Sequence, residues 1–187
     1  NPNQMTKLLK YFVLPLLTVA SLSSCSYVKE RTKRHSPEDT VMVQTAGFEA
    51  KIFYCRPYKK GRLIFGEKST DAKVPYGEYW RLGANEATEI EFSKNVLLGD
   101  VPVNKGRDVR YAIPGADECG LGLKTETGRW GAREADADRD IARYAAKVVK
   151  LTSEVEQFTF RFTEAGDAVI LQGMWADVSF QVPISLQ

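Results

Sequence analysis

The sequence predicts an all-β fold, a single β-sandwich of the jelly-roll type, for residues 41–187. From Val41 onward, short segments of alternating apolar and polar residues are separated by glycine and proline, which is the pattern of half-buried strands. The alternation is clearest in Gln157–Phe162, where phenylalanine occupies every second position. Turn signals recur at the spacing that is typical of sandwiches and barrels. They lie at Gly66, Gly77, Gly99, Pro114, Gly115, Gly128 and Gly166.

Six segments have the length and composition of strands. In chain order they are Glu49–Arg56, Thr88–Phe92, Val96–Val101, Arg107–Ile113, Gln157–Phe162 and Ala168–Val182, with a break at Gly173 left open. In the second segment, Ile90 and Phe92 face one side while Glu89 and Glu91 face the other. This alternation predicts one buried face and one solvated face.

Residues 133–146 fit two interpretations. The segment is rich in alanine, arginine and aspartate, which favours a short helix with Ile141 and Ala145 on its apolar face. The alternative is an edge strand over Tyr144–Val149. We therefore expect an all-β domain that contains one short helix at most.

The N-terminal residues 1–24 predict a bacterial lipoprotein signal peptide. Lys7 and Lys10 form a positive region, and the apolar run Leu8–Ala20 is shorter than the roughly 20 residues of a membrane-spanning helix. Small residues then precede Cys25, as lipoprotein processing requires. We expect cleavage before Cys25 and acylation of its thiol, for example with palmitate. Residues 1–4 precede Met5 and are expected to be a start-site artefact.

Residues 25–40 predict a lipidated, flexible tether between the anchor and the domain. The segment is polar and has no apolar periodicity, and its first half is basic. The basic residues either attract anionic lipid head groups or simply solvate a linker. Ser26 follows the cysteine where an aspartate would act as a retention signal, and no acidic run follows Cys25. We therefore expect an outer-membrane lipoprotein that faces the periplasm.

The charge balance excludes one class of partner. The chain has a formal net charge of +2, and Lys7 and Lys10 account for it, so the mature chain is expected to be neutral. General nucleic-acid binding depends on a basic electrostatic field. The sequence therefore predicts no nucleic-acid partner, and the membrane is the partner that the lipid anchor implies.

The small numbers of histidines and cysteines exclude some classes of catalytic and metal site. The only histidine, His35, lies in the expected tether, so the domain has no imidazole for Ser-His-Asp or Cys-His catalysis. The same scarcity argues against a zinc site, and we predict neither a metal nor a cofactor. Cys55 and Cys119 remain either a disulfide or two buried free thiols.

The segment Val74–Thr88, which reads VPYGEYWRLGANEAT, holds the densest group of candidate binding residues. Its aromatic rings can stack on a sugar or another ring, while its cation, amide and carboxylate can fix the orientation of a ligand. Together with two arginines from the preceding segment, the candidate ligand-binding residues are Arg56, Arg62, Tyr76, Trp80, Arg81, Asn85 and Glu86.

Strand periodicity adds a second expectation for Glu86. A strand over Thr88–Phe92 places Glu86 on the inward side, and Arg56 shares a face with Ile52 and Tyr54. A buried charge needs a partner, so we predict that Glu86 pairs with Arg56, Arg62 or Arg81. Such a group is either a polar plug at one end of the sandwich or part of a ligand site.

Four motifs resemble a bacterial envelope family that is catalogued as domain of unknown function 2911. They are YCRPYKKGRLIFG (54–66), VPYGEYWRLGANEATEIEFSKNV (74–96), IPG (113–115) and GRWGA (128–132). The resemblance covers about 41–187 and implies a single β-rich domain on exported or lipid-anchored proteins, with no established activity. It also favours strand for part of Ile141–Lys150. Cys55 and Cys119 depart from the family pattern, so a bridge between them would be particular to this chain.

Three functional hypotheses follow. The first is a lipid-anchored envelope protein whose domain binds a small molecule or glycan without transforming it. The second is an accessory subunit of an outer-membrane protein complex, which would need an exposed apolar patch or sheet edge. The third is a hydrolase that uses Glu86 with another carboxylate; the candidates for this second carboxylate are Glu78, Glu89, Glu91 and Glu118. The sequence assigns no catalytic residue and favours binding.

Overall fold

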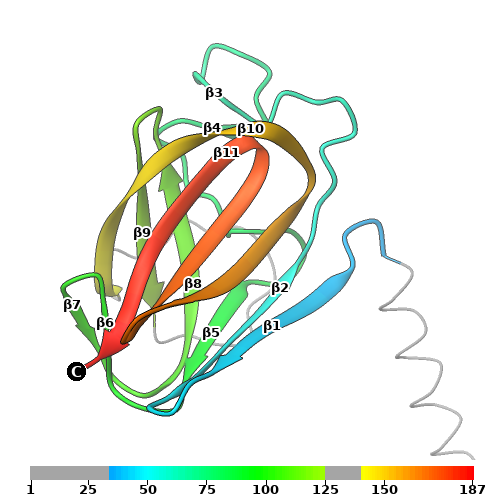
Figure 1. Cartoon of the computed structure of the whole chain (residues 1–187). Coiled ribbons are helices and arrows are strands. Elements are labelled where there is room, and N and C mark those ends of the chain that lie inside the picture. The colour runs from blue at the N-terminus through cyan, green and yellow to red at the C-terminus, as the bar shows by residue number, and fades with distance from the viewer. Residues whose placement is uncertain (1–33, 125–139) are drawn as a thin grey trace, which may run out of the picture. The chain divides into compact units, whose positions relative to one another are not determined.

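The structure is a computed structural model that describes residues 34–124 and 140–187. The chain divides into two units, Asn1–Pro37 and Glu38–Gln187, and the described part of the second unit consists of strands and turns (Figure 1). The predicted all-β class is therefore confirmed. Within the described residues, no helix has the length and apolar character needed to cross a bilayer.

The described part of the chain contains eleven strands. They are β1 (Glu38–Gln44), β2 (Glu49–Cys55), β3 (Phe65–Gly66), β4 (Val74–Pro75), β5 (Thr88–Phe92), β6 (Val96–Leu98), β7 (Val101–Val103), β8 (Gly106–Pro114), β9 (Glu118–Lys124), β10 (Asp140–Ala165) and β11 (Ala168–Leu186).

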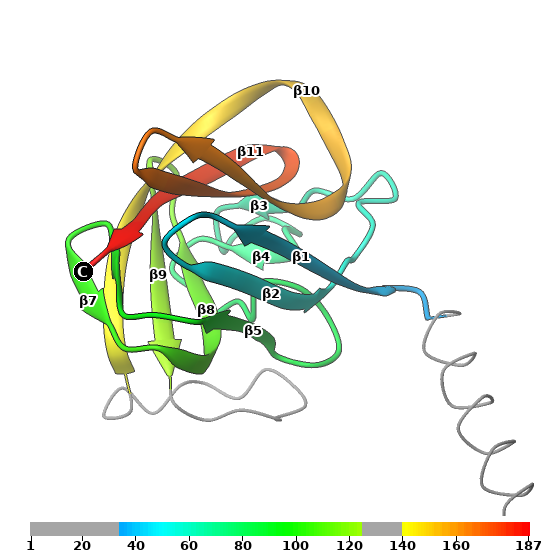
Figure 2. The same cartoon turned by 60° about the horizontal axis from the view of Figure 1, so that its bottom comes forward.

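Nine of these strands form one antiparallel sheet in the order β1-β2-β5-β8-β9-β10-β11-β6-β7, and β3 and β4 form a small parallel pair. The long strand β10 links the two layers of the sandwich. Its first part pairs with β9 and its second part with β11, and register shifts between Lys150 and Thr159 interrupt the second pairing. Such irregularities bend a strand, and Figure 2 shows β10 arching away from β9 and over β11.

The core lies between the two layers and is rich in aromatic residues. Phe158 and Phe160 are almost fully buried and Phe162 packs against the core, which confirms the predicted inward row. Tyr54 of β2 contacts the rings of Phe158 and Phe160 edge-on, with ring centroids 5.8 and 5.0 Å apart. The Tyr54 hydroxyl also accepts a hydrogen bond of 3.1 Å from the backbone N–H of Phe160, so the two layers are joined by polar as well as apolar contacts.

The helix expected over 133–146 is wrong for the residues that the structure describes. Residues 140–146 belong to β10, and residues 133–139 lie outside the described part. Ala142 and Ala146 are buried while Arg143 and Ala145 are exposed, which is the period of a strand. Pairing with β9 supplies the backbone partners that override the helical propensity of alanine. The alternative interpretation, a strand over Tyr144–Val149, is confirmed as part of β10. Its residues pair with β9 up to Lys147 and with β11 from Val148.

Three other boundaries differ from the sequence-based expectation. The segment Val96–Val101 is a hairpin of β6 and β7, because Gly99 turns the chain with a φ of +64° and packs against the ring of Tyr144. Gly173 does not interrupt β11, where the ring of Phe180 occupies the space above it. Strand β1 begins at Glu38, within the range expected for the tether.

Candidate functional site

A tight loop over residues 81–86 connects Trp80 to β5. Trp80 is held against β8 by a pair of backbone hydrogen bonds with Ala112, of 2.8 and 2.7 Å. Within the loop, Leu82 and Asn85 adopt positive φ angles of 56° and 55°. This conformation is costly for a bulky residue such as leucine, and it persists only where surrounding contacts impose it.

Several contacts hold the loop in this shape. The buried Thr88 hydroxyl donates a 2.7 Å hydrogen bond to the Leu82 carbonyl, and Nη1 of Arg81 donates to the Asn85 carbonyl at 2.5 Å. Gly83 lies so close to β2 that an added Cβ would sit 2.8 Å from the Cys55 carbonyl oxygen. Leu82 is fully buried and anchors the loop in the core. The motif RLGANEAT therefore specifies a rigid loop.

This loop forms one wall of a pocket of about 460 Å³. The volume falls in the range of small-molecule sites, which is about 300–1,000 Å³. The pocket combines aromatic side chains, three cations and small residues of the loop. The lining residues are Pro57, Arg62, Lys73, Val74, Tyr79, Trp80, Arg81, Gly83, Ala84, Asn85 and Trp175.

Two stacked tryptophans contribute to the lining. The rings of Trp80 and Trp175 lie 5.9 Å apart with an interplanar angle of 21°, and both side chains are more than nine-tenths buried. Phe65 and Phe158 support them from the core. The pocket therefore includes a rigid aromatic surface.

A backbone irregularity in β11 follows Trp175. The next residue, Ala176, has a φ of +52°, and it lies where the pairing between β10 and β11 shifts register. The extra residues of this register shift lie on β10, which therefore bends opposite Ala176. The bend that joins the two layers thus also places Trp175 beside Trp80.

The Nε1 atoms of both tryptophans are buried and have no hydrogen-bond partner among the described residues. A buried N–H without an acceptor is costly, by about 1–3 kcal/mol, and is rare in folded proteins. Trp80 and Trp175 both line the pocket. The two tryptophans of the lining therefore each carry a buried donor that lacks an acceptor in the described part of the protein.

The charged groups of the lining are all cationic. Arg62, Lys73 and Arg81 contribute positive charge, and the described lining residues include no aspartate or glutamate. Arg62 donates to the backbone carbonyls of Tyr58 and Lys59, which are neutral acceptors. Within the described residues, only Lys73 of the three forms an ion pair, with an exposed aspartate, Asp71, at 3.2 Å.

Four of the seven predicted ligand-binding residues line this pocket, namely Arg62, Trp80, Arg81 and Asn85. Arg56 and Tyr76 do not. The Arg56 guanidinium donates to the Phe158 carbonyl at 3.1 Å and to the Thr159 hydroxyl at 2.8 Å, and it pairs with Asp39 at 3.2 Å. Arg56 therefore links the two layers. Tyr76 packs against the hydrophobic core.

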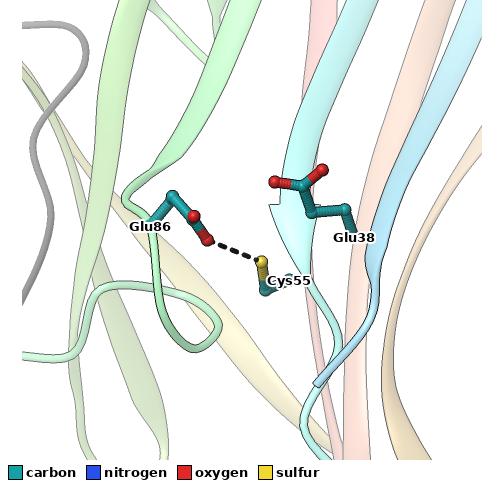
Figure 3. Close-up of side chains that lie close together, drawn as sticks. All are labelled: Glu38, Cys55 and Glu86. Atoms are coloured by element: carbon teal, nitrogen blue, oxygen red, sulfur yellow. Dashed lines mark hydrogen bonds between the residues drawn. The ribbon is translucent and has the colours of Figure 1, made fainter. Parts of the chain in front are cut away.

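Glu86, the remaining candidate, lies on the other side of the loop and meets the end of β2. Its Oε2 accepts a hydrogen bond of 3.3 Å from Sγ of Cys55, and Glu38 of β1 lies beside both (Figure 3). Burial, reinforced by the Glu86 carboxylate, raises the pKa of Cys55 to about 11. The thiol therefore keeps its proton at neutral pH and acts as a donor.

Glu38, Cys55 and Glu86 each offer one potential metal-ligand atom, and these atoms lie within 4.8 Å of one another. Carboxylate and thiolate ligands suit a divalent ion such as Zn²⁺. The raised pKa of Cys55 opposes this use, because a metal would first have to displace the thiol proton. The sequence argument missed this grouping, because Glu38 lies in the range expected for the tether.

Sequence reasoning did not select Lys73, Tyr79 or Trp175 as ligand-binding residues. Lys73 directly precedes the VPYG motif, so its position in the sequence was a usable signal. Trp175 carried no such signal, because the bend in β10 and the pairing of β11 bring it to the pocket. Trp130 of the GRWGA motif lies outside the described residues.

Among the described residues, four charged side chains are buried, and the most deeply buried of them is Arg110 of β8. It is opposite Thr88 and Leu123 on the inward face of the sheet, and its guanidinium is fully buried. All three of its side-chain nitrogens have no hydrogen-bond partner among the described residues. Burial lowers the pKa of Arg110 to about 10, so the group remains charged at neutral pH.

The two remaining cysteines are buried and not bonded to each other. The sequence left open whether Cys55 and Cys119 form a disulfide, and the structure shows two free thiols. Burial raises the pKa of Cys119 to about 12, against the opposing effect of the nearby Arg110. Neither thiol has the lowered pKa that reactive cysteines show.

The carboxylates considered for a hydrolase do not line the pocket. Glu89 is buried, although the strand alternation predicted a solvated position, and it pairs with Arg107 at 2.5 Å. Glu78 pairs with Lys68 at 2.5 Å. Glycoside hydrolysis needs two carboxylates on either side of the bond that is cleaved. The described lining of the pocket does not provide this pair.

Comparison with known proteins places the chain in a family. No curated protein and no solved structure gives a significant match. A family model described as protein of unknown function, DUF2911, matches residues 36–184, which include β1, the loop and all of the described pocket lining. This range is most of the chain. The protein therefore belongs to the DUF2911 family.

Proposed function

We propose that this protein is a lipid-anchored cell-envelope protein whose β-sandwich binds a small molecule or a glycan without transforming it. The observation that carries the proposal is the aromatic-lined pocket of about 460 Å³ beside the rigid 81–86 loop. Aromatic faces stack on sugar and other rings, and a few convergent polar groups fix the orientation of the ligand.

The rigidity of the 81–86 loop supports a role in ligand binding rather than a role in packing alone. The strained loop is held from three sides, by Thr88, by Arg81 and by close contact with Cys55. A wall that is already ordered loses little entropy when a ligand binds, which increases affinity. The positive φ of Leu82 is backbone strain of the kind that clusters at binding sites.

The anchor is the second part of the proposal and rests on the sequence. The apolar run and small residues before Cys25 support lipidation at that thiol. Acylation would hold the domain at the outer membrane, on its periplasmic face. Replacing Cys25 with serine should move the protein from the membrane fraction to the soluble fraction and abolish labelling by a palmitate analogue. Unchanged membrane association would contradict the proposed anchor.

Binding is tested with the full-length protein and a panel of glycans and small carboxylic acids. Two of the three tryptophans in the chain line the pocket, so ligand binding should change the intrinsic fluorescence. The variant Ala84→Phe would fill the pocket from its wall, whereas Ala145→Phe adds the same ring at an exposed position of β10. Saturable binding that Ala84→Phe removes and Ala145→Phe preserves would support the site. Equal binding by both variants would contradict it.

The accessory-subunit hypothesis has less support. The large exposed hydrophobic residues of the described part come from five different segments, and no single segment presents an apolar stripe. They are Met42, Leu63, Ile113, Val149 and Leu186. Isolated apolar residues are normal on a protein surface. A partner that co-purifies with the wild-type protein after crosslinking, and still does so with Ala84→Phe, would favour this second function.

A further inference from the structure

The pocket described above has an excess of donors and positive charge, and this imbalance indicates what kind of ligand it takes. The inference rests on the proposed function and adds the chemical class of the ligand. Of the described lining residues, three are cationic and none is acidic. Arg62 and Arg81 use their guanidinium groups on neutral backbone carbonyls, so their charge is not compensated by a carboxylate within the described residues.

The buried polar atoms show the same imbalance independently. Every buried side-chain nitrogen or oxygen that lacks a partner among the described residues is an N–H donor. These atoms belong to Trp80, Trp175 and Arg110. Trp80 and Trp175 line the pocket, and their exposed fractions are 6% and 4%. The described lining therefore contains no acidic residue, and Asp71 beside it compensates only Lys73.

We propose that the pocket binds a carboxylated ring compound. A carboxylate offers two acceptor oxygens, which match the forked geometry of an arginine. Arg62 and Lys73 at the exposed rim attract the anion, and the less exposed Arg81 lies deeper in the wall. The ring packs on the aromatic part of the lining, which includes Trp80 and Trp175.

Other ligand classes fit this lining less well. A cationic ligand would meet three like charges and gain no carboxylate partner. A neutral sugar could stack on the rings but would leave the positive charge uncompensated. An apolar ligand could pack on the rings but would offer no carboxylate to Arg62 and Arg81.

Matched pairs of probes isolate the contribution of the charge. Glucuronate and glucose share a sugar ring, and benzoate and benzyl alcohol share an aromatic ring, while glucosamine adds the opposite charge. Isothermal titration of the full-length protein should show that the carboxylate of each pair binds at least about ten-fold more tightly than its neutral partner. The two pairs also distinguish a sugar acid from an aromatic acid as the preferred ring type. The preference should decrease with added salt, because the rim cations are exposed.

Charge-removing variants test whether the rim is responsible. Lys73→Gln and the double variant Arg62→Gln with Lys73→Gln should lower the affinity for the carboxylates stepwise, about ten-fold in the double variant, and leave the neutral probes unchanged. Arg161→Gln is the matched control, because it removes one positive charge from an exposed residue of β10 outside the pocket.

The outcomes separate this inference from the proposed function. Equal or tighter binding of the neutral probes or of glucosamine would overturn the carboxylate assignment and leave ligand binding intact. Equal losses in Arg161→Gln and Lys73→Gln would overturn it as well, because the effect would then come from net charge alone. Failure of all five probes, together with the wider glycan and acid panel, would overturn the proposed function itself.

Discussion

Trp80 and Trp175 stack with their ring centroids 5.9 Å apart, although one follows the VPYG motif and the other lies in β11 near the end of the chain. Each ring buries its Nε1 atom without a hydrogen-bond partner in the described part of the protein. The pair thus stabilises the core through its apolar area and carries a polar cost at the same time. Substitutions at Trp175 separate these two contributions.

Trp175→Phe should change the free energy of unfolding by no more than about 1 kcal/mol in the absence of ligand. The smaller ring loses packing, but the substitution also removes an N–H whose burial costs about 1–3 kcal/mol. Trp175→Ala removes the whole ring and should cost about 3–5 kcal/mol. Urea titration followed by circular dichroism measures both. A loss above 3 kcal/mol in the phenylalanine variant would show that the indole N–H has an acceptor in the ligand-free protein.

Arg110→Met should stabilise the protein by about 1–4 kcal/mol. The guanidinium is fully buried and charged, and burial lowers its pKa to about 10. Replacing a buried charged group with an apolar side chain of similar shape is often stabilising. The variant Arg107→Met is the control on the same strand, since Arg107 is about half exposed and pairs with Glu89. A lower melting temperature for Arg110→Met than for the wild type would indicate that Arg110 holds an anion in solution.

The buried thiols should make the protein sensitive to alkaline pH. The pKa values of Cys55 and Cys119 rise from an ordinary 9.0 to about 11 and about 12. A raised pKa in the folded state means that the stabilisation is complete below about pH 9 and decreases as the pH rises through 11. Thermal unfolding between pH 8 and pH 11 should therefore show a falling melting temperature.

Two variants make the thiol prediction specific. Cys55→Ser keeps a donor for Glu86 and removes one titrating group, so its melting temperature should fall less above pH 9. In a Cys25→Ser protein, the two remaining thiols should react with a disulfide reagent at pH 8 only as fast as the protein opens, since both are buried. Rapid reaction of the native protein would contradict the burial of Cys55 and Cys119.

Gly122→Ala should destabilise the protein by about 1–3 kcal/mol, because the added methyl group would collide with the ring of Tyr111. Tyr111 in turn stacks on Tyr79, a pocket residue, at a centroid distance of 5.2 Å. Gly120→Ala is the matched control on the same strand, where the nearest atoms lie at ordinary contact distances of 3.6 and 3.8 Å. Equal stabilities of the two variants, measured by urea unfolding, would refute this close approach.

Local sequence patterns predicted much of the sheet and part of the site. Strand β5 begins and ends where its alternation predicted, and the inward phenylalanines of β10 are buried. Trp80, Arg81 and Asn85 could be selected together because neighbours in one loop stay close in any fold. The helix predicted from composition was wrong at residues 140–146. Alanine favours a helix in isolation, but pairing with β9 determines a strand there.

The sequence by itself determined the all-β class, the family and the residues of the rigid loop, because these depend on short-range periodicity and a contiguous motif. Only the tertiary structure decided which of those residues face the pocket. The bend in β10 and its pairing with β11 bring Trp175 to Trp80, while Glu86 accepts the thiol hydrogen of Cys55. The physical reason is that strand pairing joins residues distant in the chain, and local sequence patterns do not reveal those pairings.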